Sequence, residues 1–214
     1  MSLWVGLVAS STWRHIVLVA LRPWAHVLLL ASTSPATLVV VPPPPSTGRG
    51  RASAKRGRLR REAARVVLLA PDDSVLLLSG RDPSGAGVGP FWLVPGGGAK
   101  EGEAPEDAAR REAYEELGTR LGDLGPPVWR RHTSFVFDGW LYDQKELFFV
   151  VRTPRFTPVP TALTELERRF TTGARWWPLA ELATTTETIF PAQLAELVEA
   201  WLSAGPPPTP LPID

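Results

Sequence analysis

The chain has 214 residues, of which 44% are hydrophobic, so it can form one domain with a sizeable core plus extensions. Its net charge of +1 conceals an uneven distribution. Residues 1–61 hold nine Lys or Arg and no acid, which leaves 14 of the 23 basic residues against all 22 acids over 62–214, a balance of −8. The acidic part argues against a general nucleic-acid binder, and the absence of cysteine excludes disulfides, thiolate metal sites and cysteine nucleophiles.

Residues 1–61 are predicted to form an extension of low order. The apolar runs at 16–21 and 27–32 are separated by Arg22, so no uncharged stretch reaches the ~20 residues that a membrane-spanning helix needs. The same arginine breaks the pattern of a secretory signal. Residues 42–61 are Pro-rich and then basic, a composition that indicates a linker because it buries too little surface to become ordered.

Two interpretations of this extension remain open. It is either an unstructured leader, including the case of a start codon assigned too early, or a tether to a membrane or a nucleic acid. The composition favours the leader, so we expect no nucleic-acid partner and no stable membrane insertion. The protein is expected to be cytoplasmic and either a monomer or a homodimer.

Residues 62–204 are predicted to form the main domain, which begins with a hairpin. The segments ARVVLLA and SVLLLSG read as strands, with Asp72–Asp73 in the turn between them. FWLVP reads as a short strand that runs into Gly96–Gly98. These glycines allow the backbone to approach its neighbours closely, because they carry no Cβ.

A helix is predicted over Pro105–Leu117, with proline at its first position and Gly118 just past its end. Glu112, Glu115 and Glu116 share one stripe of this helix. Each like-charged pair costs ~0.2–0.5 kcal/mol, and the negative end of the helix dipole disfavours an anion by ~0.3–1 kcal/mol. A solvated charged face is one interpretation, and a bound divalent cation that turns repulsion into coordination is the other.

The later elements complete a mixed pattern. VWRRHTSFVF and KELFFVV read as strands joined by the loop DGWLYDQ, and ARWWPL reads as a strand before a short helix at 180–183. An amphipathic helix is predicted over 191–202, followed by a disordered Pro-rich tail over 205–214. Strands with two helices of unequal length indicate an α/β (α+β) sandwich with a mixed sheet.

The segment from Gly97 to Thr119 follows the spacing G-x5-E-x7-R-E-U-x-E-E-x-G-U, in which U is a bulky aliphatic residue. The fixed positions are Gly97, Glu103, Arg111, Glu112, Glu115, Glu116 and Gly118. Ala113 is a small choice for the first U, and Thr119 departs from the last one, which affects packing at the helix exit. This segment resembles the Nudix box, and the resemblance extends across 62–204. It implies a Nudix-type α/β/α sandwich with a mixed β-sheet.

The resemblance also implies a reaction, namely metal-dependent hydrolysis of the pyrophosphate bond of a nucleoside diphosphate linked to another moiety. Mg²⁺, with Mn²⁺ as a possible substitute, is the implied cofactor, and oxygen ligands suit both ions. By position, Glu115 and Glu116 would be the principal ligands, together with Glu112. The Gly97 carbonyl would be a further ligand, and Glu103 would support the cluster from the loop.

The remaining implied roles concern proton transfer and orientation. Arg111 would orient the carboxylates by ion pairing. Glu112 or a residue outside the box would accept the proton of the attacking water. Asp143 and Glu146 are the outside candidates, and Glu146 is preferred because it directly precedes the strand LFFVV.

Signs of the substrate are sparse. The aromatic residues that could stack on a base are Trp92, Phe135, Phe137 and Tyr142. Arg130 could contact phosphates, although an edge-strand charge is an equal interpretation. Positions 133–136 lack the proline or tyrosine that would mark subfamilies acting on ADP-ribose or dinucleotide polyphosphates.

Two other functions compete with hydrolysis. A non-catalytic Nudix-like module that senses a nucleotide is disfavoured, because a pure binder has no need of the complete carboxylate set. A Nudix-fold isopentenyl diphosphate isomerase is disfavoured by the absence of cysteine.

Overall fold

The computed structural model describes residues 6–10, 13–17, 57–85 and 89–214. The chain divides into two units, residues 1–52 and 53–214, which are taken separately below. In the first unit, β1 (Gly6–Ser10) pairs antiparallel with β2 (Trp13–Val17), so part of the extension predicted to be of low order forms strands. The predicted linker lies outside the described residues up to position 56.

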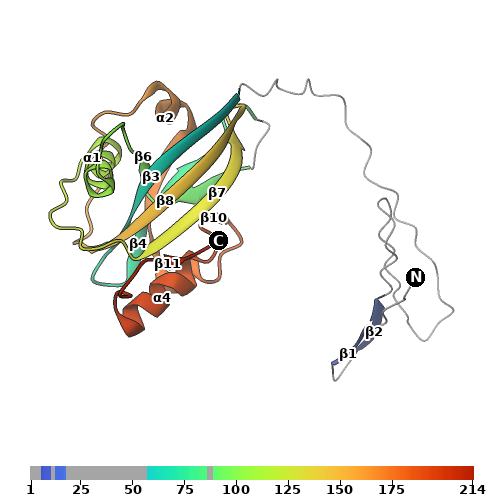
Figure 1. Ribbon diagram of the computed structural model, residues 1–214. Helices are drawn as coiled ribbons and strands as arrows, with labels where there is room; N and C mark the ends of the chain where they lie inside the picture. Colours follow the sequence, from blue (N-terminus) through green and yellow to red (C-terminus); the bar gives the residue numbers. More distant parts are fainter. Residues whose placement is uncertain (1–5, 11–12, 18–56, 86–88) are drawn as a thin grey trace. The chain divides into compact units, whose positions relative to one another are not determined.

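The second unit is built on a nine-stranded mixed sheet (Figure 1). The strand order is β10-β5-β4-β3-β8-β7-β11, while β6 pairs with β3 and β9 pairs with β4. The strands are β3 (Gly57–Leu69), β4 (Ser74–Gly80), β5 (Phe91–Leu93), β6 (Gly96–Gly98), β7 (Trp129–Phe137), β8 (Trp140–Arg152), β9 (Thr171–Pro178), β10 (Thr188–Phe190) and β11 (Leu211–Pro212). Since β3 begins at Gly57, ahead of the predicted domain start at residue 62, the end of the predicted linker belongs to the sheet.

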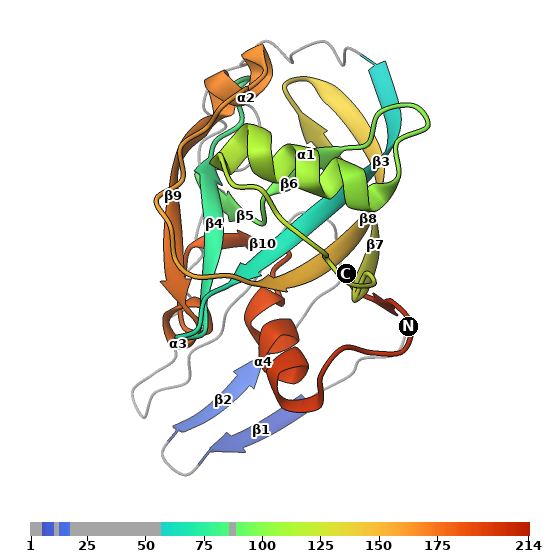
Figure 2. The same cartoon turned by 90° about the vertical axis from the view of Figure 1, so that its left-hand side faces the viewer.

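Helices cover both faces of this sheet (Figure 1, Figure 2). The helices are α1 (Pro105–Leu117), α2 (Glu165–Phe170), α3 (Leu179–Leu182) and α4 (Leu194–Ala204). Alternate residues of β3 point to opposite faces: Val67 packs in the cluster that contains α4, and Val66 packs in the cluster that contains α1. This arrangement confirms the predicted α/β/α sandwich. No described helix is long and apolar enough to span a membrane.

The turns of two hairpins can be compared with the prediction, and only the first agrees with it. The turn between β3 and β4 falls at the expected position, where Asp73 adopts a positive φ of 57°. The loop predicted between the strands that became β7 and β8 is wrong in length, because Trp140 pairs directly with Phe137. Asp138 and Gly139 alone make this turn, with φ values of 45° and 78° that match the right-handed strand twist.

The helix α1 has the predicted boundaries. Pro105 occupies its first turn, and Gly118 ends it in the left-handed region at φ 71°, where its N–H donates to the carbonyl of Tyr114. The helix face formed by Ala109, Ala113 and Leu117 is buried against the sheet, as expected. Glu112 and Glu116, on another side of the helix, lie against the glycine strand β6.

Several later elements differ from the prediction. Helix α4 begins at Leu194 rather than at residue 191, and the short helix α2 was not predicted at all. The tail predicted to be disordered contains β11, which pairs in parallel with β7. The N–H of Ile213 donates to the carbonyl of Arg130 at 2.9 Å, so backbone hydrogen bonds hold this segment against the sheet.

Candidate active site

The glycine strand β6 comes unusually close to α1 because it has no side chains. A Cβ at Gly97 would lie 2.6 Å from Oε1 of Glu112, and a Cβ at Gly96 would lie 2.1 Å from the carbonyl oxygen of Ala64. Gly96 also has a φ of 128°. Gly96 and Gly97 are therefore required for the backbone to fit between β3 and the acidic face of the helix.

The carboxylates of α1 occupy different environments. Glu112 and Glu116 are buried, with only 5% and 3% of their surface exposed, while Glu115 is partly exposed. Glu116 accepts a hydrogen bond from the Gly96 N–H at 2.8 Å. The three glutamates thus do not form the uniform exposed stripe that helix spacing suggests, because the glycine strand covers two of them.

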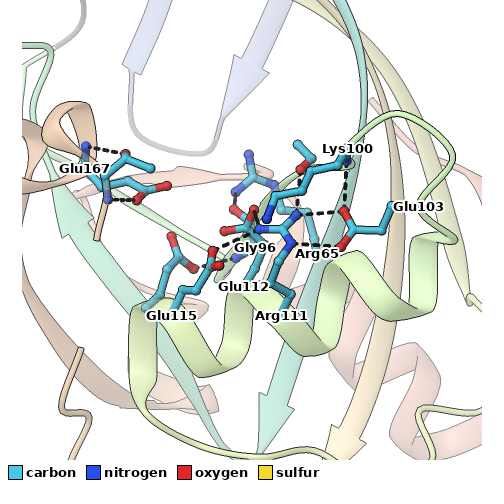
Figure 3. Close-up of polar contacts among 11 residues, drawn as sticks. Arg65, Gly96, Lys100, Glu103, Arg111, Glu112, Glu115 and Glu167 are labelled. Atoms are coloured by element: carbon cyan, nitrogen blue, oxygen red, sulfur yellow. Dashed lines mark hydrogen bonds and ion pairs between the residues drawn. The ribbon is translucent and has the colours of Figure 1, made fainter. Parts of the chain in front are cut away.

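Arg111 holds much of the acidic face together (Figure 3). Its guanidinium donates to both oxygens of Glu103, at 2.8 and 2.9 Å. It also donates to Glu112 at 2.7 Å and to Glu115 at 2.9 Å, and a further N–H reaches the carbonyl of Gly98 at 3.0 Å. The ion pair with Glu115, four residues along the helix, is therefore one contact of a larger set, which connects the loop to the helix.

The environments shift the pKa values in opposite directions. Hydrogen bonds from Arg111 lower the pKa of Glu103 to about 2. Burial raises the pKa of Glu116 to about 8, and burial also raises the pKa of Glu112 despite its bond to Arg111. The two buried carboxylates therefore carry an electrostatic cost that a bound cation would relieve.

A third carboxylate, from α2, completes a cluster. Single oxygen atoms of Glu112, Glu116 and Glu167 all lie within 4.8 Å of one another. Glu167 also accepts from the Thr164 N–H at 2.6 Å, while its own N–H donates to the Thr164 hydroxyl. This capping box fixes Glu167 beside the site. An all-oxygen donor set that includes two buried carboxylates fits Mg²⁺ or Mn²⁺.

Glu167 was missed by sequence reasoning. Its only local indication is the pattern T-x-x-E over 164–167, which marks the start of a helix and says nothing about metal binding. Its contribution depends on the fold, which brings α2 to the end of α1.

Glu146 lies in the same cavity but is held by cations. Its carboxylate pairs with Arg65 at 3.0 Å and Arg131 at 2.5 Å, and it accepts from the Gln144 amide at 2.6 Å. Burial favours the protonated form, yet the two arginines outweigh it and the pKa of Glu146 is lowered. Arg65 also donates to the carbonyl of Gly96 at 2.5 Å, so Glu146 is linked to the glycine strand.

The cavity has a volume of about 590 Å³, within the range of ligand pockets, and its lining includes the three clustered carboxylates. Tyr142 lines it and stacks on Phe135 with ring centroids 5.2 Å apart and planes 10° apart. The guanidinium of Arg61 lies 4.6 Å from the centre of the Tyr142 ring and forms no ion pair with any described residue.

Four predicted residues do not line this cavity, and one of them, Glu103, is held by Arg111. The indole N–H of Trp92 donates to Glu187 at 2.5 Å, and its ring packs edge-on against the core. Arg130 borders a separate cavity of about 600 Å³. Asp143 is bound to His132 at 2.7 Å and to Arg58 at 2.5 Å, outside the lining.

Comparison with known proteins identifies the class. A model of the NUDIX domain family matches residues 59–198, so the chain belongs to this family. Diphosphoinositol polyphosphate phosphohydrolase 3-alpha from Mus musculus is 38% identical over 72 residues, which cover 31% of this chain and 40% of that protein. RNA pyrophosphohydrolase from Bartonella bacilliformis is 60% identical over 39 residues, which cover 18% of this chain and 23% of that protein.

These matches span less than half the length of either relative. Among solved structures, a NUDIX hydrolase from Nitrosomonas europaea is 19% identical with a TM-score of 0.49, over 72% of this chain and 94% of that one.

Proposed function

We propose that this chain hydrolyses the pyrophosphate bond of a nucleoside diphosphate linked to another group, with Mg²⁺ or Mn²⁺ as cofactor. The observation that carries the proposal is the cluster of Glu112, Glu116 and Glu167 in a cavity that also contains guanidinium groups. Carboxylates alone would repel a pyrophosphate. A cation bound by the carboxylates would remove this repulsion, so that a pyrophosphate could lie between the cation and the arginines. Family membership and relatives named for pyrophosphohydrolysis support the same reaction.

The three clustered carboxylates would hold the cation, together with the carbonyl of Gly97. A bound divalent cation withdraws negative charge from phosphate oxygens and makes a water molecule more acidic. Glu103 and Glu115, which sequence reasoning placed among the ligands, contact Arg111 and are not part of the three-carboxylate cluster. We assign them to keeping Arg111 in position, and through it the carboxylate of Glu112.

The arginines of the cavity divide into two groups. Arg65 and Arg131 are paired with Glu146, and Arg65 also holds the glycine strand, so they maintain the shape of the site. Arg61 forms no ion pair among the described residues and can bind a phosphate group without giving up a carboxylate partner.

We assign the proton acceptor to Glu112 rather than to Glu146. Glu112 belongs to the carboxylate cluster, so it would lie next to a water molecule that the bound cation makes more acidic. Glu146, which sequence reasoning preferred, has its pKa lowered and its oxygens occupied by three donors. It is better suited to hold Arg65 and Arg131 in place.

The test is a screen of the full chain with Mg²⁺ or Mn²⁺ against nucleoside diphosphate derivatives, a diphosphoinositol polyphosphate and 5′-triphosphorylated RNA. We expect release of a nucleoside monophosphate or phosphate from a nucleoside derivative, and loss of this release with a chelator. Binding of nucleotides without any product would instead identify a sensing module. The cytoplasmic location and the choice between monomer and homodimer stay predictions.

A further inference from the structure

The residues that line the cavity follow one another in a fixed order along the hairpin of β7 and β8. The antiparallel register gives rows of facing residues that lie two positions, or about 7 Å, apart on each strand. The rows are Arg131–Glu146, Thr133–Gln144, Phe135–Tyr142 and Phe137–Trp140. At least one member of each row lines the cavity. The cavity therefore changes along the sheet from charged and polar rows to aromatic rows.

The aromatic rows lead to a group of phenylalanines, which we call the aromatic end of the cavity. Phe91 meets Phe137 edge-to-face with centroids 6.4 Å apart and meets Phe190 at 5.7 Å. Phe170 meets Phe137 at 5.4 Å, again edge-to-face. All four line the cavity, so this end offers apolar rings to whatever enters it.

The clustered carboxylates form the other end, and Arg61 lies between the two. At the carboxylate end, Gly96 of β6 pairs with Arg65 of β3. Arg61 precedes Arg65 by four residues on the same strand and faces Gln144 in the register of β3 and β8. Its guanidinium lies 4.6 Å from the centre of the Tyr142 ring, and a Cβ at Gly98 would lie 3.4 Å from its Nη1. Arg61 therefore connects the glycine strand with the aromatic rows.

A buried amide holds this guanidinium. The Nε–H of Arg61 donates to Oε1 of Gln144, and Nε2 of Gln144 donates to Oε1 of Glu146 at 2.6 Å. Gln144 has no exposed surface, so no water competes for these contacts. A flipped amide would point its N–H groups at Arg61 and its oxygen at a carboxylate. The two partners therefore fix the orientation of the amide.

The outer nitrogens of Arg61 are left without a partner. Among the described residues, neither Nη nitrogen has a hydrogen-bond acceptor, because the bond from Nε is the one that Arg61 donates through its side chain. In the same part of the chain, the side-chain atoms that are both enclosed and unpaired belong to other residues. Solvent therefore reaches these two nitrogens, and Arg61 lines the cavity.

The neutral amide keeps the charge of Arg61 available. Arg65 and Arg131 both pair with Glu146, whereas Gln144 links Arg61 to that carboxylate without contributing a charge. Burial, together with the nearby Arg65, lowers the pKa of Arg61, so the protein does not fully offset its positive charge. A guanidinium with a fixed Nε and two open Nη groups suits a phosphate.

We infer that Gln144 is a positioning residue, which holds Arg61 between the two ends of the cavity so that the Nη groups bind a phosphate of the substrate. This inference rests on the proposed function and extends it. The diphosphate would lie between the carboxylate end and Arg61, with its attached group toward the aromatic end. Gln144 acts through Arg61 and does not touch the substrate, because it is fully buried.

The test is a double-mutant cycle with Arg61→Met and Gln144→Met, measured as kcat/KM on a nucleoside diphosphate derivative that the wild type hydrolyses. We expect Arg61→Met to lower kcat/KM about 10²-fold, because a charged donor to the phosphate is lost. Gln144→Met should lower it about 10-fold, because Arg61 loses its fixed orientation. In the Arg61→Met background, Gln144→Met should change kcat/KM by less than about twofold.

Two results of the cycle would overturn the inference. If Gln144→Met still lowers kcat/KM about 10-fold in the Arg61→Met background, Gln144 acts on the fold or on Glu146 and not through Arg61. If Gln144→Met alone is as active as the wild type, Arg61 needs no support from the amide. The control is Gln193→Met, whose amide donates to the carbonyl of Asp214 outside the cavity lining and which should match the wild type.

A second variant applies if circular dichroism shows that Gln144→Met does not fold. Gln144→Asn keeps an amide but shortens the side chain by one methylene, so the amide cannot reach both Arg61 and Glu146. The same cycle is expected: a loss of about 10-fold in the wild-type background and less than about twofold with Arg61→Met. Equal losses in the two backgrounds would reject the inference.

The two proposals fail in different ways. If no nucleoside derivative is hydrolysed, the proposed reaction is wrong, and the cycle is then measured as the affinity for ADP with Mg²⁺ by calorimetry. Coupled losses of affinity still support the action of Gln144 through Arg61, whereas additive losses, or no binding by the wild type, reject it. If hydrolysis occurs and the losses in kcat/KM are additive, only the inference about Gln144 is wrong.

Discussion

The two ends of the cavity are built in different ways. The carboxylate end comes mainly from one continuous stretch, the glycine strand β6 and the helix α1, with Glu167 added from α2. The aromatic end is assembled from strand ends and loops that are far apart in the chain. The first end therefore follows a local pattern suited to one chemical step, while the second depends on the fold and can set which molecule is accepted.

The largest effect is expected at the carboxylate end. Glu116→Gln keeps the shape of a buried side chain and removes one ligand charge, so kcat should fall by about 10³-fold or more while nucleotide binding persists. The matched control is Glu199→Gln on the exposed face of α4, which should be unaffected. Steady-state kinetics and circular dichroism would check both, and near-normal turnover of Glu116→Gln would show that the cluster is not catalytic.

A smaller loss is expected when the glycine strand is displaced. In Gly97→Ala the new Cβ would meet the carboxylate of Glu112 at 2.6 Å, so the strand or the helix must shift. A displacement of this size at reacting groups costs about 10²-fold in kcat/KM. Gly122→Ala is the control, because a Cβ there meets nothing within 4 Å. Equal activity of the two variants would contradict the close packing of Gly97 and Glu112.

At the aromatic end, the effect should fall on binding rather than on chemistry. Phe170→Leu removes a ring that contacts Phe137, so KM should rise about 10-fold while kcat changes little. Phe156→Leu removes an equivalent edge-to-face contact with Trp176, outside the cavity lining, and should leave KM unchanged. A fall in kcat without a change in KM for Phe170→Leu would place this ring in the chemical step.

The pH dependence of the free energy of unfolding should report on the carboxylate end of the cavity. Burial raises the pKa of Glu116 from 4.5 to about 8, so the unfolded chain loses this proton well before the folded protein does. Without divalent cations, this group therefore reduces the stability of the fold as pH rises from about 5 to 8, by at most about 1.4 kcal/mol per pH unit. Thermal melts in chelator should show this decline in wild type and a weaker one in Glu116→Gln. Parallel curves for wild type and Glu116→Gln would refute it.

The smallest effect is expected from the amino-terminal unit. Deletion of residues 1–52 leaves β3 intact, because this strand begins at Gly57. We expect kcat/KM to stay within about twofold of the full chain, since the cavity lining among described residues lies entirely in the second unit. Loss of activity on deletion would contradict this expectation. It would show that the amino-terminal unit is more than an unstructured leader and contributes to the reaction.

The sequence predicted best what depends on neighbours along the chain. The boundaries of α1 follow from Pro105 and Gly118, and the first hairpin follows from Asp72–Asp73. The second hairpin was predicted with too long a loop, because the polar residues after Gly139 resemble a loop until their pairing with β7 is known. Sequence periodicity cannot show such pairing.

The site residues also divide into those that the local sequence indicates and those that only the fold brings together. The Nudix-like spacing singled out Glu112 and Glu116 as candidate ligands, whereas Glu167 belongs to a helix of six residues whose only local indication is a cap. Trp92 and Arg130 were placed in the site on residue type alone, and their strand positions direct them elsewhere.

The central claim is that Glu112, Glu116 and Glu167 bind a divalent cation together, and titration with Mn²⁺ tests it most directly. Electron paramagnetic resonance of free Mn²⁺ would be followed for wild type, Glu167→Gln and the control Glu165→Gln, each with and without a nucleoside diphosphate. We predict saturable uptake by wild type and Glu165→Gln that is weakened about 10-fold or more in Glu167→Gln. Uptake that is absent from wild type, or equal in all three proteins, would contradict the account.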